Sequence, residues 1–131
     1  MARKGTILVI DNESDQLEMM KEILGRIGFD AKTTDNPQQA LEMVGKQAFS
    51  LIFIDLIMSE IDGTDLCEQI KQVRPGVCVY AFSGHAHLYS PERLERAGFD
   101  GAIGKPATME EIKAAVSRAM ETQTQRITRP C

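Results

Sequence analysis

Four short polar segments of this chain each come at the end of an apolar run. They are Asp11-Asn12-Glu13, Asp55, Ser83-Gly84 and Lys105-Pro106. An ionised carboxylate directly after four apolar residues, as at Asp55, is costly to desolvate unless a cation or hydrogen-bond donors meet it. Two acidic segments, a hydroxyl and a lysine therefore form a candidate functional site, provided that the fold brings them together.

Each of these segments also has an ordinary structural explanation. Asp-Asn-Glu-Ser is common where a loop leads into a helix, Ser83-Gly84 suits a turn, and Lys105 can be a solvated loop lysine. The functional interpretation therefore depends on whether all four segments meet at one edge of the fold.

The apolar runs before these segments predict β-strands. Three runs are continuous and rich in β-branched or aromatic residues, as expected for central strands covered on both faces: 6–10, 51–54 and 77–82. Two weaker and more polar runs, 29–34 and 101–103, are typical of edge strands, which have fewer neighbours to bury them.

Stripes of apolar residues at helical spacing lie between the strand runs, and capping residues mark their ends. Ser14 is expected to cap the first helix, and Gly28 can end it. Asn36-Pro37, Ser90-Pro91 and the capping box 108–111 open later helices.

The alternation of five strands with five helices predicts an α/β fold, with a doubly wound five-stranded parallel sheet and helices on both faces. Parallel strands end on one edge of such a sheet, and ligands bind there, at the carboxyl ends of the strands. The four polar segments all follow strands, so we expect them to converge on one rim.

Length and charge limit the other function classes. The 131 residues suit one domain at 1–121, followed by a frayed or disordered tail at 122–131 that lacks an apolar stripe. A net charge of -4 argues against a nucleic-acid-binding face, and no apolar stretch approaches the roughly 20 residues needed to span a bilayer. We therefore expect a cytoplasmic protein with no nucleic-acid or membrane partner.

The cysteines and histidines do not indicate a second site. Cys67, Cys78 and Cys131 are odd in number and form no Cys-x-x-Cys pair, so they predict neither a disulfide framework nor a zinc cluster. His85 and His87 flank one alanine, but no second ligand cluster accompanies them. Exposed or hydrogen-bonded loop histidines are therefore favoured over a transition-metal site.

In order and spacing, these segments resemble the receiver domains of bacterial two-component response regulators over residues 6 to about 120. The resemblance is carried by Ile7–Glu13, by Leu51–Met58 with Ile61-Asp62-Gly63 after it, by Ser83 and by Lys105-Pro106. It implies a flavodoxin-like sheet with strand order 2-1-3-4-5 and a typically cis peptide bond between Lys105 and Pro106.

The resemblance implies a signalling switch rather than an enzyme. Asp55 would accept a phosphoryl group from a sensor histidine kinase or phosphotransfer protein, while Lys105 and the Ser83 hydroxyl would bind its oxygens. Signalling would follow from a shift to a conformer that binds an unidentified downstream protein around the fourth helix, fifth strand and fifth helix. We expect a stand-alone receiver, either a monomer or a weak homodimer, that works by protein contact or by passing the phosphoryl group onward; a fragment of a longer protein would read the same.

The resemblance also implies Mg²⁺ as cofactor, since a carboxylate nucleophile needs a dication to offset its repulsion of the phosphoryl oxygens. Asp55, Asn12 and the backbone carbonyl of Ile57 would hold the ion, and Asp11 would orient its waters. Asn12 departs from the family pattern, in which the acidic pair usually offers two carboxylates, so weaker Mg²⁺ binding is expected. Glu13 is a candidate to compensate.

Ala102 is a second departure, because many family members carry an aromatic residue there that swings inward as the hydroxyl moves. We therefore expect output to rely on the loop 84–90 and the helix after it. Together with Asn12, Ala102 leaves open a pseudo-receiver that folds alike but is never phosphorylated. An aspartate-nucleophile phosphatase would need an acid at Ile57, and a flavin-binding protein would need a phosphate loop where this chain has acids.

Overall fold

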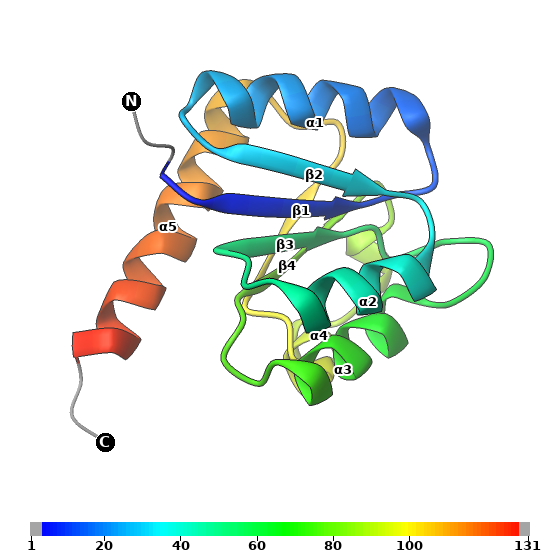
Figure 1. Ribbon diagram of the computed structural model, residues 1–131. Coiled ribbons are helices and arrows are strands. Elements are labelled where there is room, and N and C mark those ends of the chain that lie inside the picture. The colour runs from blue at the N-terminus through cyan, green and yellow to red at the C-terminus, as the bar shows by residue number, and fades with distance from the viewer. Residues whose placement is uncertain (1–3, 129–131) are drawn as a thin grey trace.

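Five parallel strands form one sheet in a computed structural model that describes residues 4–128 and the side chains of residues 4–121 (Figure 1). The strands are β1 (Thr6–Ile10), β2 (Asp30–Thr34), β3 (Leu51–Ile54), β4 (Val79–Ser83) and β5 (Gly101–Gly104). Their order is β2-β1-β3-β4-β5. The predicted fold class, strand order and edge strands are confirmed.

Helices cover the sheet in two layers, one on each face (Figure 1). One layer holds α1 (Ser14–Arg26) and α5 (Met109–Thr128); the other holds α2 (Pro37–Lys46), α3 (Gly63–Val73) and α4 (Pro91–Ala97). A short 3₁₀ turn, η1 (Ala86–Leu88), follows β4. Because the helices lie against the two faces, the carboxyl ends of the strands are left to the connecting loops.

Alternate residues of the central strands belong to two separate cores. Leu8 and Ile10 of β1 pack in the core beneath α2, α3 and α4, whereas Ile7 and Val9 pack in the core beneath α1 and α5. All four side chains are buried. A strand covered on both faces needs a continuous apolar run, which is why β1 and β3 could be recognised from the sequence.

The helix starts agree with the sequence, with one exception. Three predicted caps accept a backbone N–H from three residues further on: Asn36, Ser90 and Thr108. The prediction for Ser14 was wrong, because α1 already includes Ser14 and Glu13 holds the N-cap position without a side-chain cap. The Asp11 carboxylate accepts the Glu13 N–H at 3.0 Å, and this bond turns the chain into the helix early.

Strand β4 begins at Val79 rather than at Val77. The Val77 N–H donates to the Arg74 carbonyl and so closes the turn after α3. At the start of the strand, the Asp100 carboxylate accepts the Val79 N–H at 2.9 Å and the Lys71 ammonium at 3.0 Å. These bonds join α3, the start of β4 and the approach to β5.

The last helix continues past the predicted domain end. The backbone of α5 is helical through Thr128, whereas the side chains from residue 122 and the whole of residues 129–131 lie outside the described part of the chain. The frayed tail at 122–131 therefore stays a prediction. Within the described residues, every helix is too short or too polar to cross a membrane.

Gly63 is packed too closely to admit a larger residue. A Cβ there would lie 2.5 Å from the Asp55 carbonyl oxygen and 2.7 Å from Leu56 Cα. We expect Gly63→Ala to lower the free energy of unfolding by about 1 to 3 kcal/mol, because backbone atoms must shift to admit the methyl group. Urea denaturation followed by circular dichroism measures the change.

Gly25→Ala is the matched control. Gly25 lies in α1, and a Cβ there would have no neighbouring atom within 4 Å. This substitution should raise the free energy of unfolding by roughly 0.5 to 1 kcal/mol, since alanine favours the helix. Coincident unfolding curves for the two variants would contradict the steric explanation for Gly63.

Candidate functional site

The carboxyl ends of four strands bring the predicted site residues together. Asp11 follows β1, Asp55 follows β3, Ser83 ends β4 and Lys105 follows β5. The Lys105 ammonium contacts a carboxylate oxygen of Asp11 and lies 3.7 Å from a carboxylate oxygen of Asp55. One lysine therefore bridges two acidic side chains at the rim that the topology predicts.

Backbone hydrogen bonds continue the sheet beyond the strands and so hold the two aspartates. The Asp11 N–H donates to the Thr34 carbonyl at 3.2 Å, and the Asp55 N–H donates to the Ile10 carbonyl at 3.0 Å. Asp11 is 1% exposed and Asp55 is 6% exposed. Carboxylates so removed from water need positive charge nearby, and Lys105 supplies it.

A third carboxylate, that of Glu13, lies beside the two aspartates. Carboxylate oxygens of Asp11, Glu13 and Asp55 all lie within 4.8 Å of one another. Clustered carboxylate oxygens are ligands that Mg²⁺ prefers in proteins, so the residues present fit the cofactor that the sequence suggests.

Glu13 was predicted only as a candidate to compensate for Asn12, and its place follows from the start of α1. The bond from the Glu13 N–H to Asp11 Oδ1 puts Glu13 at the N-cap, next to the rim. Asn12, which was predicted as a ligand, is exposed between these two residues. The signal available in the sequence was the acidic residue two positions beyond Asp11.

Ser83 lies beside Lys105 at the rim and is completely buried. Its hydroxyl oxygen accepts the His85 N–H at 3.1 Å, and its carbonyl accepts the Lys105 N–H at 3.1 Å. The Lys105 ammonium also lies 5.1 Å from the centre of the Phe82 ring. The peptide bond between Lys105 and Pro106 is cis, as the resemblance implies.

The loop between β3 and α3 folds back over Asp55. The Ile57 N–H lies 3.4 Å from Asp55 Oδ1, and Ile57 forms an isolated antiparallel bridge with Asp62. The Gly63 N–H donates to the Leu56 carbonyl at 2.7 Å. The backbone of Ile57, whose carbonyl is a predicted ligand, is therefore fixed next to the carboxylate.

A hollow of about 310 Å³ opens at this rim. Its lining residues are Glu13, Gln16, Asp55, Gly84, His85, Lys105 and Pro106. His85 and His87 are exposed, and neither belongs to a metal-binding cluster within the described residues. The hollow gives a small anionic group access to Asp55 and Lys105.

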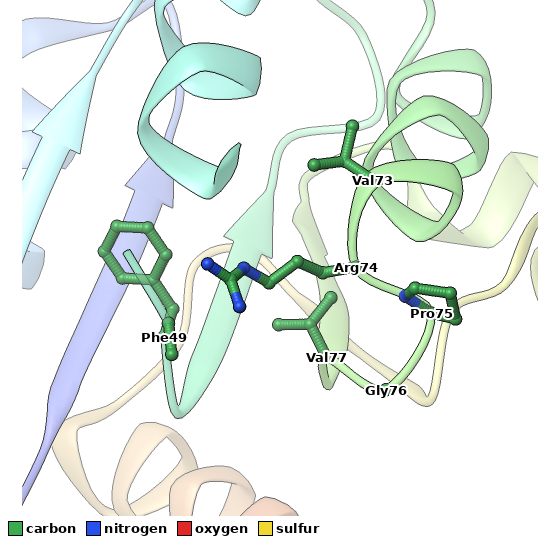
Figure 2. A pocket seen from close by; sticks show the side chains of 7 residues that line it. Phe49, Val73, Arg74, Pro75, Gly76 and Val77 are labelled. Carbon is green, nitrogen blue, oxygen red and sulfur yellow. The ribbon is translucent and has the colours of Figure 1, made fainter. Parts of the chain in front are cut away.

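A larger hollow, of about 390 Å³, lies at the opposite end of the sheet (Figure 2). It is lined by the segments that precede β3 and β4: Ala48, Phe49, Val73, Arg74, Pro75, Gly76 and Val77. Figure 2 shows the Arg74 side chain reaching toward Phe49, and Arg74 Nε donates to the Val44 carbonyl at 2.7 Å. This hollow lies at the amino ends of the strands, remote from the four polar segments, and we assign it no part in the site.

Comparison with known proteins gives one consistent result. The chain matches the response regulator receiver domain family over residues 7–117. It is 26% identical to the sensor histidine kinase RcsC of Salmonella typhi over 85% of this chain and 12% of RcsC. It is 28% identical to the DNA-binding transcriptional regulator NtrC of Azospirillum brasilense over 91% of this chain and 25% of NtrC. The chain thus spans a quarter or less of these two curated relatives.

A solved structure matches nearly end to end. The receiver domain of NtrX from Brucella abortus is 30% identical to this chain and superimposes with a TM-score of 0.82. The match covers 88% of this chain and 98% of that domain. The part of the longer relatives that this chain resembles is therefore one domain.

Lys105→Met removes the cation between Asp11 and Asp55 and keeps a long side chain. We expect the free energy of unfolding to fall by about 1 to 3 kcal/mol, because two buried carboxylates lose their positive partner. Urea denaturation in the presence of a metal chelator measures this loss.

Lys113→Met, which removes an exposed lysine of α5, is the control. It should change the free energy of unfolding by less than about 0.5 kcal/mol. Equal losses in the two variants would show that Lys105 does not stabilise the carboxylates.

Proposed function

The chain belongs to the response regulator receiver domain family, and on this basis we propose that it is a phosphorylation switch with Asp55 as its phosphoacceptor. One observation carries the proposal: the Asp55 carboxylate lies 3.7 Å from Lys105 and beside the carboxylates of Asp11 and Glu13. A cation and ligands for a dication are the groups that phosphoryl transfer to an acidic nucleophile needs. The chain is a phosphoacceptor in this proposal, not an enzyme.

The proposed donor is a phosphohistidine of a sensor histidine kinase or of a phosphotransfer protein. A carboxylate oxygen of Asp55 attacks phosphorus, and the P–N bond to the imidazole breaks with its electron pair returning to the ring nitrogen. Water later attacks the acyl phosphate, releasing inorganic phosphate and restoring the carboxylate. The likeness to part of a sensor histidine kinase supports a partner of this class.

Mg²⁺ is the proposed cofactor; when bound, it offsets the repulsion between the Asp55 carboxylate and the phosphoryl oxygens. Asp55, the Asn12 amide oxygen and the Ile57 backbone carbonyl are the proposed ligands, with Asp11 orienting the bound waters. Glu13 is a further proposed ligand, because its carboxylate lies within 4.8 Å of the other two.

Two side chains are proposed to respond to the phosphoryl group. Lys105 moves its ion pairing from Asp11 to the phosphoryl oxygens. The Ser83 hydroxyl accepts the His85 N–H and so keeps its own hydrogen as a donor to a phosphoryl oxygen. This donation draws the loop after β4 toward Asp55.

The proposed output is a change of protein binding. The displaced loop favours a conformer that presents α4, β5 and α5 differently to a downstream protein. We place the switch in the cytoplasm, as a monomer or weak homodimer with no nucleic-acid or membrane partner.

Two observations favour a second candidate, the pseudo-receiver that is never phosphorylated. Asn12 provides no charge in the acidic pair, and Ala102 provides no aromatic ring behind Ser83. The ion pair between the buried Asp55 and the half-buried Lys105 favours the phosphorylated switch, because both chemical groups that the reaction needs are in place.

The direct test is phosphoryl acceptance. Incubation of the wild type with acetyl phosphate and Mg²⁺ should add the mass of one phosphoryl group, and Asp55→Ala should add none. Intact-mass measurement reads both results, and Asp30→Ala, at an exposed aspartate of β2, is the control expected to label like the wild type. A wild type that never labels would favour the pseudo-receiver, and undiminished labelling of Asp55→Ala would remove Asp55 from its role.

The charge at position 12 should set Mg²⁺ affinity. We expect Asn12→Asp to strengthen Mg²⁺ binding by about 1 to 3 kcal/mol, since one carboxylate charge is added in a partly solvated site. Glu13→Gln should weaken binding if Glu13 compensates for Asn12. Titration calorimetry with MgCl₂ measures both changes. Equal Mg²⁺ affinities in the wild type and Asn12→Asp would contradict the role of Asn12. An Mg²⁺ affinity of Glu13→Gln equal to that of the wild type would exclude Glu13 as a ligand.

A further inference from the structure

The two loops that border Asp55 are tied to each other by one side chain. The first loop runs from Asp55 to Asp62, and the second runs from Gly84 to Ser90. Tyr89, in the second loop, donates its hydroxyl hydrogen to Asp62 Oδ2 at 3.0 Å. Among the described residues, no backbone hydrogen bond joins these two loops, so the tyrosine hydroxyl makes the polar connection.

Asp62 is a fixed anchor for this bond. Its Oδ1 accepts the backbone N–H of Thr64 at 2.8 Å and the Thr64 hydroxyl at 2.7 Å. One carboxylate oxygen therefore caps α3 while the other holds Tyr89. Asp62 also forms the backbone bridge with Ile57, whose N–H reaches the Asp55 carboxylate. The anchor is thus connected to the phosphoacceptor through a single residue.

Tyr89 is held from the side of α4 as well. The ring is 9% exposed and belongs to the core beneath α2, α3 and α4. The Arg93 guanidinium lies 4.4 Å from the ring centre, and one of its nitrogens lies 4.0 Å from Asp62 Oδ2. Ser90 caps α4 immediately after Tyr89. Movement of the tyrosine is therefore coupled to the start of α4.

Local hydrogen bonds connect Tyr89 back to Ser83. The His85 N–H donates to the Ser83 hydroxyl, the Leu88 N–H to the His85 carbonyl, and the Tyr89 N–H to the Ala86 carbonyl. The two backbone bonds form the 3₁₀ turn η1. A displacement of the Ser83 hydroxyl is thus passed along one turn to Tyr89.

The protonation states of Tyr89 and Asp62 at neutral pH are those that their hydrogen bond requires. Burial raises the pKa of Tyr89, and its hydrogen bond to Asp62 raises it further. Burial acts to raise the pKa of Asp62 as well, but hydrogen bonds from Thr64 and Tyr89, with the charge of Arg93, lower it on balance. At neutral pH the pair is therefore a phenol donating to a carboxylate, which is a charge-assisted hydrogen bond.

We propose that Tyr89 is a positioning residue whose bond to Asp62 holds the loop 84–90, and with it Ser83, in its present place. The proposal rests on the proposed function of Asp55 and extends it by naming the contact that the switch must break. Drawing Ser83 toward a phosphoryl group pulls η1 and lifts Tyr89 from Asp62. The strength of this one hydrogen bond then sets the equilibrium between the two conformers of the loop.

The structure offers a place for the displaced ring. A hollow of about 580 Å³ lies between α4 and β5, with Tyr89, Ala86, Leu94, Phe99 and Ala102 among its lining residues. Ala102 contributes only a methyl group to this wall. A ring that leaves Asp62 can therefore move between α4 and β5 without displacing a larger side chain.

The first test measures the loop in unphosphorylated protein. Tyr89→Phe removes the hydroxyl and keeps the ring, and we expect the backbone amides of residues 84–90 to exchange with deuterium about three- to tenfold faster. Amides of β3 report global unfolding and should be unchanged. Tyr80→Phe is the matched control, because Tyr80 is the other tyrosine of the chain and packs in the core beneath α1 and α5. Unchanged exchange at 84–90 in Tyr89→Phe would overturn the proposal.

A double-mutant cycle tests whether Asp62 is the partner. Asp62→Ser keeps an N-cap oxygen for α3 but is too short to reach Tyr89. It should speed exchange at 84–90 as Tyr89→Phe does, and the double variant should exchange no faster than either single variant. Additive effects of the two substitutions would show that Tyr89 does not act through Asp62.

Phosphoryl acceptance separates this proposal from the proposed function. With acetyl phosphate and Mg²⁺, Tyr89→Phe should reach a larger phosphorylated fraction than the wild type, as read by intact mass. If the wild type is labelled and Tyr89→Phe reaches the same phosphorylated fraction, the positioning role is overturned while Asp55 remains the phosphoacceptor. Absence of labelling in every variant would overturn the proposed function and, with it, the switching role of Tyr89.

Discussion

The ion pairing of Lys105 with Asp11 and Asp55 is the interaction on which the rest of the rim depends. Two buried carboxylates at the ends of neighbouring strands repel each other and lose hydration, so a cation must lie between them. The sheet makes this possible because β5, the edge strand, delivers the lysine across β4 to the ends of β1 and β3. The parallel topology therefore places charges from residues 11, 55 and 105 in one contact, and the surrounding loops take their positions from it.

The loops add a second level of order around these charges. The loop after β3 is closed by the bridge of Ile57 with Asp62 and by the close approach of Gly63 to the Asp55 carbonyl. The loop after β4 is ordered by hydrogen bonds within η1 and by the bond of Tyr89 to Asp62. A strong electrostatic contact is thus bordered by short loops held by a few polar bonds. Such polar bonds cost less to break than the core contacts. The loops that they hold are therefore the part of the domain that can move most readily.

The sequence predicted those features that depend on local pattern. Continuous apolar runs identified β1 and β3, three side-chain caps identified helix starts, and residues following strands identified Asp11, Asp55, Ser83 and Lys105. Features that depend on individual side-chain hydrogen bonds were missed. The Asp11 carboxylate shifted the start of α1 and brought Glu13 to the rim, and the bond of Tyr89 to Asp62 spans 27 residues. No periodicity encodes either bond, because the first is a local side-chain bond and the second depends on how two irregular loops are placed by the finished core.

The division of the sheet into two cores has an evolutionary consequence. Adjacent residues such as Ile7 and Leu8 belong to opposite layers, so a substitution at one changes the packing of α1 and α5, while its neighbour affects α2, α3 and α4. Substitutions in opposite layers that lie more than about 7 to 10 Å apart and share no partner residue tend to have additive effects on stability. Mutations that remodel one layer can therefore accumulate with little compensation in the other. One helical layer can therefore be altered by mutation while the packing of the opposite layer is retained.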